Sequence, residues 1–205
     1  MKKIFSFVLF AIIAVAAKAS NDGLVYFPPL GDATVLNYEF DLSRVSIDNR
    51  DLATYINMER RHNAYLLRMS DDEAYDRILQ ELERAYVENT NAYIQKASVV
   101  QNMRRTHNSR LQLSNSSSSR FKLRISLVNF DEDGEHTVYV DILDQNKGGA
   151  LITSFSVDNN MDVDLSNDFV PFFKELKKAG KRLGEGIVKI VQNANNRKAK
   201  AYLTL

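Results

Sequence analysis

The chain of 205 residues contains no cysteine, no tryptophan and only three prolines. Without cysteine the protein has no disulfide bond, no thiolate metal site and no cysteine nucleophile. It also lacks the cysteine to which bacterial lipoproteins attach their lipid, so we expect a protein that is not lipid-anchored. Its stability must come from burial of apolar surface, for which a chain of this length is sufficient.

The chain also lacks a large excess of either positive or negative charge. The chain carries 27 basic and 26 acidic residues, for a net charge of +1. Lys2, Lys3 and Lys18 lie near the N-terminus, and without the first 19 residues the chain has 24 basic and 26 acidic residues, a net charge of −2. Nucleic-acid binding requires a basic surface, so no nucleic-acid partner is predicted.

The sequence motifs of common catalytic and cofactor sites are missing. There is no GxSxG nucleophile motif, no phosphate-binding loop and no dinucleotide-binding glycine motif. His62, His107 and His136 are too far apart in the sequence to form a metal-binding pair on one helix. We therefore predict no catalytic, cofactor-binding or metal-binding residue, and no cofactor.

The only long apolar run is at the N-terminus. Lys2 and Lys3 precede an apolar stretch at residues 4–17, and Ala17, Lys18 and Ala19 match the small-x-small rule for cleavage. The alternative is a retained membrane anchor, for which the run is short. We expect a signal peptide at residues 1–19 that is cleaved after Ala19, no transmembrane segment after cleavage, and a periplasmic or secreted protein.

The remainder is expected to form an irregular N-terminal arm, residues 20–33, and one domain, residues 34–205. Two glycines and two prolines between residues 23 and 31 indicate the arm. A strand is predicted at 35–47, where Leu36, Tyr38, Phe40 and Leu42 alternate with polar residues. A helix is predicted to begin near Arg50, capped by Asp48 or Asn49.

Two longer helices are predicted from helical periodicity. Ser70 and Glu73 form a capping box before a helix at 71–95. Its apolar stripe consists of Tyr75, Ile78, Leu79, Leu82, Ala85, Tyr86 and Tyr93. Asp168 or Ser166 caps a second helix at 169–192, in which Gly180 and Gly184 indicate close packing on the sheet or on another helix. The alternative is a basic amphipathic helix at a membrane surface.

The stretch 121–157 alternates polar and apolar residues in three runs separated by two turns, which predicts an antiparallel meander with a bulge near Val128. The predicted fold is therefore α+β. It is a single two-layer domain with an antiparallel sheet of about five strands, covered on one face by the helices near 71–95 and 169–192. The polar face, with Lys122, Arg124, Tyr139 and Asp141, is expected to stay open or meet a partner.

Besides the three histidines, two groups of residues are candidate sites, and a basic patch is considered with them. Asp162, Asp164, Ser166 and Asp168 have the alternating oxygens of a calcium loop, but Asn167 replaces its glycine and Phe173 its glutamate, so a helix-capping loop is the favoured interpretation. Residues 131–135, Asp131 to Glu135, favour a hairpin turn over a site. The basic patch of Arg104, Arg105, His107 and Arg110 is interpreted as solvated surface, with an anion or polysaccharide contact as the alternative.

Three stretches carry a resemblance to a family of exported, uncharacterised α+β envelope proteins of Gram-negative bacteria, a domain of unknown function. They are Tyr38-Glu39-Phe40-Asp41, Asn129-Phe130-Asp131-Glu132-Asp133-Gly134 and Lys178-Ala179-Gly180-Lys181-Arg182-Leu183-Gly184. The resemblance covers about residues 35–192. It implies a compact envelope domain and supplies no catalytic residues. Many members carry a lipid-attachment cysteine, which this chain lacks.

Export and the missing catalytic motifs favour a non-enzymatic protein that binds an envelope protein partner. A hydrolase assembled from distant residues is the first alternative, and a histidine beside a carboxylate or serine in a deep pocket would favour it. A carbohydrate or small-ligand binder that uses exposed tyrosines such as Tyr139 is the second. The sequence identifies neither the partner nor the oligomeric state.

Overall fold

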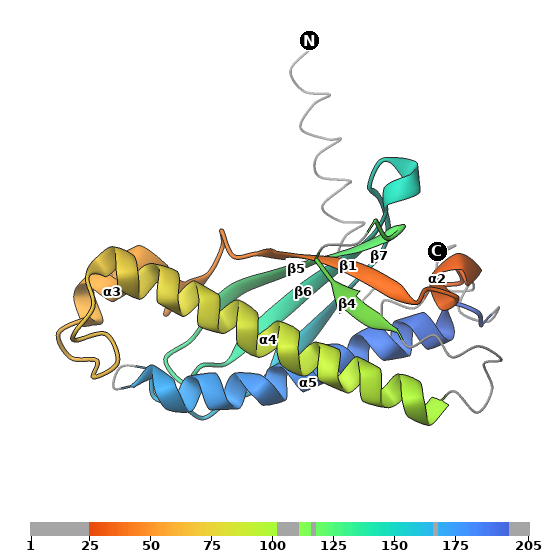
Figure 1. Cartoon of the computed structure of the whole chain (residues 1–205). Helices are drawn as coiled ribbons and strands as arrows, with labels where there is room; N and C mark the ends of the chain where they lie inside the picture. The colour runs from red at the N-terminus through yellow and green to blue at the C-terminus, as the bar shows by residue number, and fades with distance from the viewer. Residues whose placement is uncertain (1–24, 102–110, 116–117, 166–167, 197–205) are drawn as a thin grey trace, which may run out of the picture.

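The computed structural model describes residues 25–101, 111–115, 118–165 and 168–196 (Figure 1). The predicted leader, the basic patch at 104–110 and Ser166 lie outside these ranges. Within them, every helix is too short or too polar to cross a lipid bilayer.

The domain has two layers, a seven-stranded sheet and a pair of long helices that lie side by side on one of its faces (Figure 1). The two helices are α4 (Asp71–Gln101) and α5 (Phe169–Asn193). The strands are β1 (Val35–Asp41), β2 (Ser46–Ile47), β3 (Arg50–Asp51), β4 (Gln112–Ser114), β5 (Phe121–Phe130), β6 (His136–Asp144) and β7 (Ala150–Asn159). The described residues also form two short α-helices, α2 (Pro28–Gly31) and α3 (Leu52–Glu59), and a single 3-10 turn at Gln145–Lys147.

β5, β6 and β7 form the predicted antiparallel meander, with β5 in the interior of the sheet and β7 at its edge. β5 pairs antiparallel with β6, and β6 pairs antiparallel with β7. The register of β5 against β6 shifts between Leu127 and Phe130, which confirms the bulge expected near Val128.

The α+β architecture with two helices on one face of the meander is confirmed, but the sheet is larger and more mixed than the predicted antiparallel sheet of about five strands. β1 runs parallel to β5 and to β4, and β2 also runs parallel to β5. The reason is topological. The chain leaves β1, passes along α4 and returns to the same end of the sheet, and such a crossover connection joins parallel strands.

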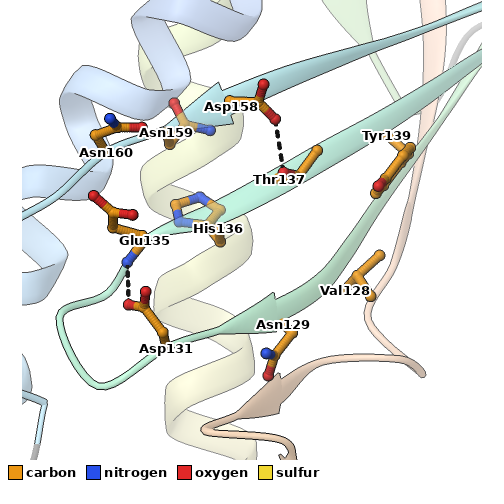
Figure 2. Close-up of a pocket in the computed structure, with 10 residues that line it drawn as sticks. All are labelled: Val128, Asn129, Asp131, Glu135, His136, Thr137, Tyr139, Asp158, Asn159 and Asn160. Atoms are coloured by element: carbon orange, nitrogen blue, oxygen red, sulfur yellow. Dashed lines mark hydrogen bonds between the residues drawn. The ribbon is translucent and has the colours of Figure 1, made fainter.

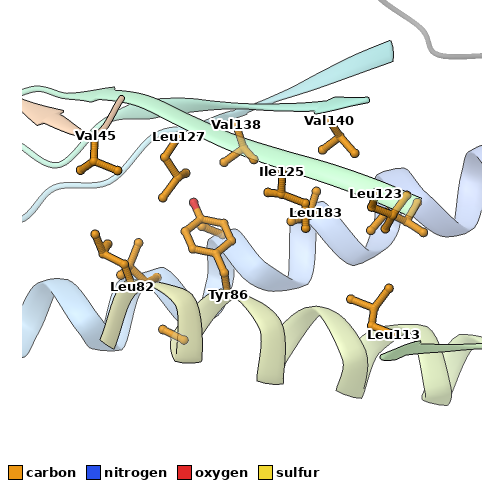
Figure 3. Packing of buried hydrophobic residues seen from close by; sticks show 14 of the residues in the cluster. Val45, Leu82, Tyr86, Leu113, Leu123, Ile125, Leu127, Val138, Val140 and Leu183 are labelled. Carbon is orange, nitrogen blue, oxygen red and sulfur yellow. The ribbon is translucent and has the colours of Figure 1, made fainter. Parts of the chain in front are cut away.

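Apolar side chains from the sheet point down onto α4 and α5 and form a single core (Figure 3). Leu123, Ile125 and Leu127 of β5 meet Val138 and Val140 of β6 on this face, and all five are buried. The apolar stripes predicted for α4 and α5 face the same core, with Leu82, Tyr86 and Leu183 among the buried members. Burial of this kind contributes about 25 cal/mol for each Å² of apolar surface, so the interlayer contact is the main source of stability.

The helices α4 and α5 approach closely at two glycines. A Cβ atom added to Gly180 would lie 2.9 Å from the Tyr86 carbonyl oxygen, and one added to Gly184 would lie 3.0 Å from the Thr90 carbonyl oxygen. At the same point the buried Thr90 hydroxyl donates a hydrogen bond of 2.9 Å to the Gly180 carbonyl. The two glycines therefore permit a backbone-to-backbone contact between the helices, as the sequence indicated.

Both long helices begin at the predicted caps. The Ser70 amide donates to the Glu73 carboxylate at 2.9 Å and the Glu73 amide donates to the Ser70 hydroxyl at 3.3 Å, which is a complete capping box. Asp168 accepts from the Val170 amide at 3.0 Å at the start of α5.

Three local predictions differ from the structure. The cap of α3 is Asp51, which accepts from the Thr54 amide, and not Asp48 or Asn49, because both of those residues have a positive φ in the turn before β3. The strand predicted at 35–47 is divided into β1 and β2, where the alternation fails. The arm at 20–33, expected to be irregular, contains the short helix α2, with Pro28 in its first turn.

Replacing Gly180 or Gly184 by alanine is predicted to destabilise the protein. Each new methyl group would be forced against the backbone of α4, a strain of about 1–3 kcal/mol that is only partly offset by a gain in helix propensity of about 1 kcal/mol. Chemical denaturation should therefore show a lower free energy of unfolding for both variants. Gly186→Ala is the control for helix propensity, because its methyl group would lie 2.8 Å from the edge of the Phe155 ring, a side chain, and not against the backbone of α4. Unchanged stability of Gly180→Ala and Gly184→Ala would contradict the close contact.

Candidate functional site on the open face of the sheet

The face of the sheet opposite α4 and α5 is covered by no other helix or strand of the described chain (Figure 1). Alternation along β5 and β6 brings the four residues predicted for this face to its surface, namely Lys122, Arg124, Tyr139 and Asp141. Arg124 pairs in register with Glu39 of β1 on one side and with Asp141 on the other. The face is therefore a band of mixed charge.

Some of these charges have partners within the sheet. Lys122 forms an ion pair with Glu39, and Asp141 accepts a hydrogen bond of 2.7 Å from the Ser154 hydroxyl. Two large apolar side chains remain exposed among them. Tyr139 is 50 % exposed, and Leu151, which pairs in register with Leu143, is 60 % exposed. Aromatic side chains such as Tyr139 are enriched at the cores of protein interfaces.

A hollow of about 530 Å³ lies at the end of this face, over the bulge between β5 and β6 (Figure 2). It is lined by Val128, Asn129, Asp131, Glu135, His136, Thr137, Tyr139, Asp158, Asn159 and Asn160. The lining is almost entirely polar, with three carboxylates and no cationic side chain. The register of β5 against β6 shifts beside the hollow, between Leu127 and Phe130.

Turn chemistry holds the rim of the hollow in place. Asp131 accepts from the amides of Asp133 and Glu135 at 3.1 and 2.8 Å, and Gly134 has the positive φ, 77°, that the turn requires. Thr137 donates to the Asp158 carboxylate at 2.7 Å, linking β6 to β7. Residues 131–135 therefore form a hairpin turn, as predicted.

His136 forms the inner wall of the hollow and is almost completely buried. Its Nδ1 lies 2.9 Å from the Gly134 carbonyl oxygen, which can only accept a hydrogen bond, so Nδ1 carries the proton. Nε2 then accepts from the Tyr86 hydroxyl of α4. Burial lowers the pKa of His136 to about 4, and it raises the pKa of Tyr86 well above its ordinary value.

This geometry favours a structural role for the histidine. Both ring nitrogens are engaged within the protein, so His136 could accept a proton from a ligand only by breaking a buried hydrogen bond. Asn159 completes the network, with its amide group donating to the Tyr86 hydroxyl at 3.5 Å and to the Val157 carbonyl at 3.3 Å. Its own side-chain oxygen is buried without a hydrogen-bond partner among the described residues.

The candidate cation site is divided between an extended segment and a helix cap. In residues 161–165 the buried side chains of Met161, Val163 and Leu165 alternate with the exposed Asp162 and Asp164. Backbone amides of this segment donate to backbone carbonyl oxygens of the hairpin. The Val163 amide donates to the Asp133 carbonyl at 3.1 Å, and the Leu165 amide donates to the Glu132 carbonyl at 3.2 Å. Asp168 is occupied as the cap of α5. Across the described residues, no three His, Asp or Glu side chains come close enough to hold a metal ion.

The structure separates the predicted histidines. His62 is exposed in the turn that follows α3, whereas His136 is the first residue of β6 and is buried. His107 belongs to the basic patch outside the described residues.

Several important polar residues were missed from the sequence. Tyr86 was expected only to be apolar core, and no sequence signal marked Asn159. Asn63 shares the helical phase of apolar residues from Leu52 onward, but its role as a fully buried donor to the Leu165 carbonyl at 3.1 Å was not predicted. Arg120 and Asp144 form a bidentate ion pair at 3.0 and 2.7 Å. Arg120 precedes β5 and Asp144 ends β6, so only the pairing of these two strands brings them together.

Comparison with known proteins assigns no family. No family model and no curated protein match the sequence. Among solved structures, protein XCC0632 from Xanthomonas campestris, described under the family model DUF330, is 10% identical and covers 87% of this chain and 91% of its own, with a TM-score of 0.38. A PelC dodecamer from Paraburkholderia phytofirmans is 12% identical over 87% of this chain and 96% of its own, with a TM-score of 0.32. These values show only a distant likeness.

The buried histidine predicts acid sensitivity. Because its pKa in the folded protein, about 4, lies below the unfolded value of 6.5, the unfolded chain binds the additional proton between these pH values. Its contribution to stability is complete above about pH 6.5 and falls by up to about 3 kcal/mol as the pH drops toward 4. Denaturation curves measured from pH 7 to pH 4 should show this loss.

The matching variants are His136→Gln, which removes the titration, and His62→Gln, which changes an exposed histidine. The stability of His136→Gln should vary less with pH than that of the wild type, while His62→Gln should retain the wild-type profile. An identical pH profile for His136→Gln and the wild type would show that the loss comes from other groups.

Proposed function

We propose that this protein is exported to the cell envelope of a Gram-negative bacterium and acts there as a non-enzymatic domain that binds a partner protein. The N-terminal residues 1–19 support export. The main support for binding is the sheet face left bare by α4 and α5, which presents Tyr139 and Leu151 to solvent. Aromatic residues of this kind are frequent anchors of protein interfaces.

The edge of the sheet adds a second mode of contact. β7 pairs only with β6, so its other edge has no strand partner in the described chain. Apart from Asp158 at its end, β7 carries no charged residue and no proline to discourage pairing. An extended segment of the partner could add to this edge and place its side chains over Leu151 and Tyr139.

A small polar ligand, such as a carbohydrate, is the second candidate. The specific observation is that the polar hollow over the bulge lies directly beside the exposed ring of Tyr139. Carboxylates and amides next to an aromatic ring are suitable for hydroxyl groups and for the apolar face of a sugar. A partner protein is favoured because the exposed surface continues beyond the hollow to Leu151.

Site-specific photocrosslinking in cells tests the interface. A photoreactive phenylalanine at position 139 or 151 should give the same discrete adduct, identified by mass spectrometry. Leu67, which is 61 % exposed near α3, is the control position and should not give it. Tyr139→Ser should leave stability within about 0.5 kcal/mol and reduce the adduct from position 151 about tenfold.

The proposal fails if a folded and exported protein gives no adduct from either sheet position, or if position 67 gives the same adduct. Loss of the adduct on addition of a soluble glycan, with direct glycan binding to the purified protein, would instead favour the second candidate.

A further inference from the structure

The helical layer contains a groove that is distinct from the open sheet face. It has a volume of about 550 Å³ and lies between α4 and α5. Its α4 side consists of Asn89, Ala92, Tyr93, Lys96 and Ala97. Its α5 side consists of Lys177 and Lys181. The groove therefore has an apolar floor and three lysine side chains at its rim.

The close contact between the helices explains the apolar floor. At Gly184 the helices approach so closely that an added Cβ would lie 3.0 Å from the Cβ of Tyr93. The half-buried Tyr93 therefore fills the seam between the helices, while the small side chains of Ala92 and Ala97 beside it leave space above. Larger residues at 92 and 97 would close this space.

The charges around the groove are mostly unneutralised. Within α4 no acidic residue follows Glu88, so the final turns of this helix carry only the positive charge of Lys96. In the described part of the chain, neither Lys96 nor Lys177 has a carboxylate within ion-pair distance. Lys181 lies 3.7 Å from Glu185, a long and exposed ion pair that a ligand could replace.

We propose that this groove binds a single-chain anionic amphiphile of the fatty-acid class. The aliphatic chain would lie on Ala92, Tyr93 and Ala97, and the carboxylate would lie among Lys96, Lys177 and Lys181. Long lysine side chains suit this arrangement, because their methylene groups cover the apolar chain while their ammonium groups reach the anion. The volume lies within the usual range of small-molecule sites.

Calorimetric titration of the purified protein with dodecanoate, below its micelle concentration, tests the proposal. Dodecanoate should bind at one saturable site, and dodecyl maltoside, which has the same chain and no charge, should bind at least tenfold more weakly. Combined Lys96→Gln, Lys177→Gln and Lys181→Gln substitutions should weaken dodecanoate binding about tenfold, as expected for three exposed ion pairs. Ala92→Phe should reduce it by a similar factor by filling the groove.

The matched control combines Lys174→Gln, Lys178→Gln and Lys189→Gln, which remove the same charge from α5 outside the groove. This variant should bind dodecanoate within about twofold of the wild type, and circular dichroism should show that all variants are folded. Absence of saturable binding, or equal weakening by both triple variants, would overturn the proposal. Binding only to vesicles that contain anionic phospholipid, without binding of dodecanoate, would also overturn it and identify α5 as a membrane-docking helix.

Discussion

The close contact of α4 with α5 is the constraint on which the rest of the structure depends. Gly180 and Gly184 bring the backbones together, and the Thr90 hydroxyl joins them by a buried hydrogen bond. The two closely packed helices lie on the same face of the sheet and bury its apolar side chains. The groove lies between these two helices, and no other helix or strand of the described residues covers the opposite face of the sheet.

The two surfaces that result differ in chemistry. The sheet face combines charged residues in register with exposed Tyr139 and Leu151, and it ends in a polar hollow without a cationic side chain. The helical groove has an apolar floor and a cationic rim. The hollow is suited to hydroxyl or amine groups, whereas the groove is suited to an anion with an apolar tail. The sheet layer and the helical layer are therefore suited to chemically different ligands.

Periodicity predicted the elements of this fold well and their pairing less well. The capping box at Ser70, the apolar stripes of both long helices and the bulge near Val128 are local patterns, so the sequence contains them directly. The parallel pairing of β1 with β5 depends on the path of the chain between them, which local pattern does not encode. The same limit applies to the buried network, because Tyr86, His136 and Asn159 come from three distant elements and only the folded chain brings them together.

The parallel pairing of β1 with β5 also bears on the order of folding. The Ser119 hydroxyl donates to the Val35 carbonyl across 84 positions of the chain, close to where the two strands begin to pair. Closing so long a loop costs conformational entropy before the contact between the strands can stabilise the chain. The hairpins of the meander close over only a few residues, so their entropy cost is smaller. The meander can therefore form early, with one edge of β5 exposed until β1 arrives. Until that strand docks, the edge of β5 that β1 covers in the native sheet is open to pairing with another chain.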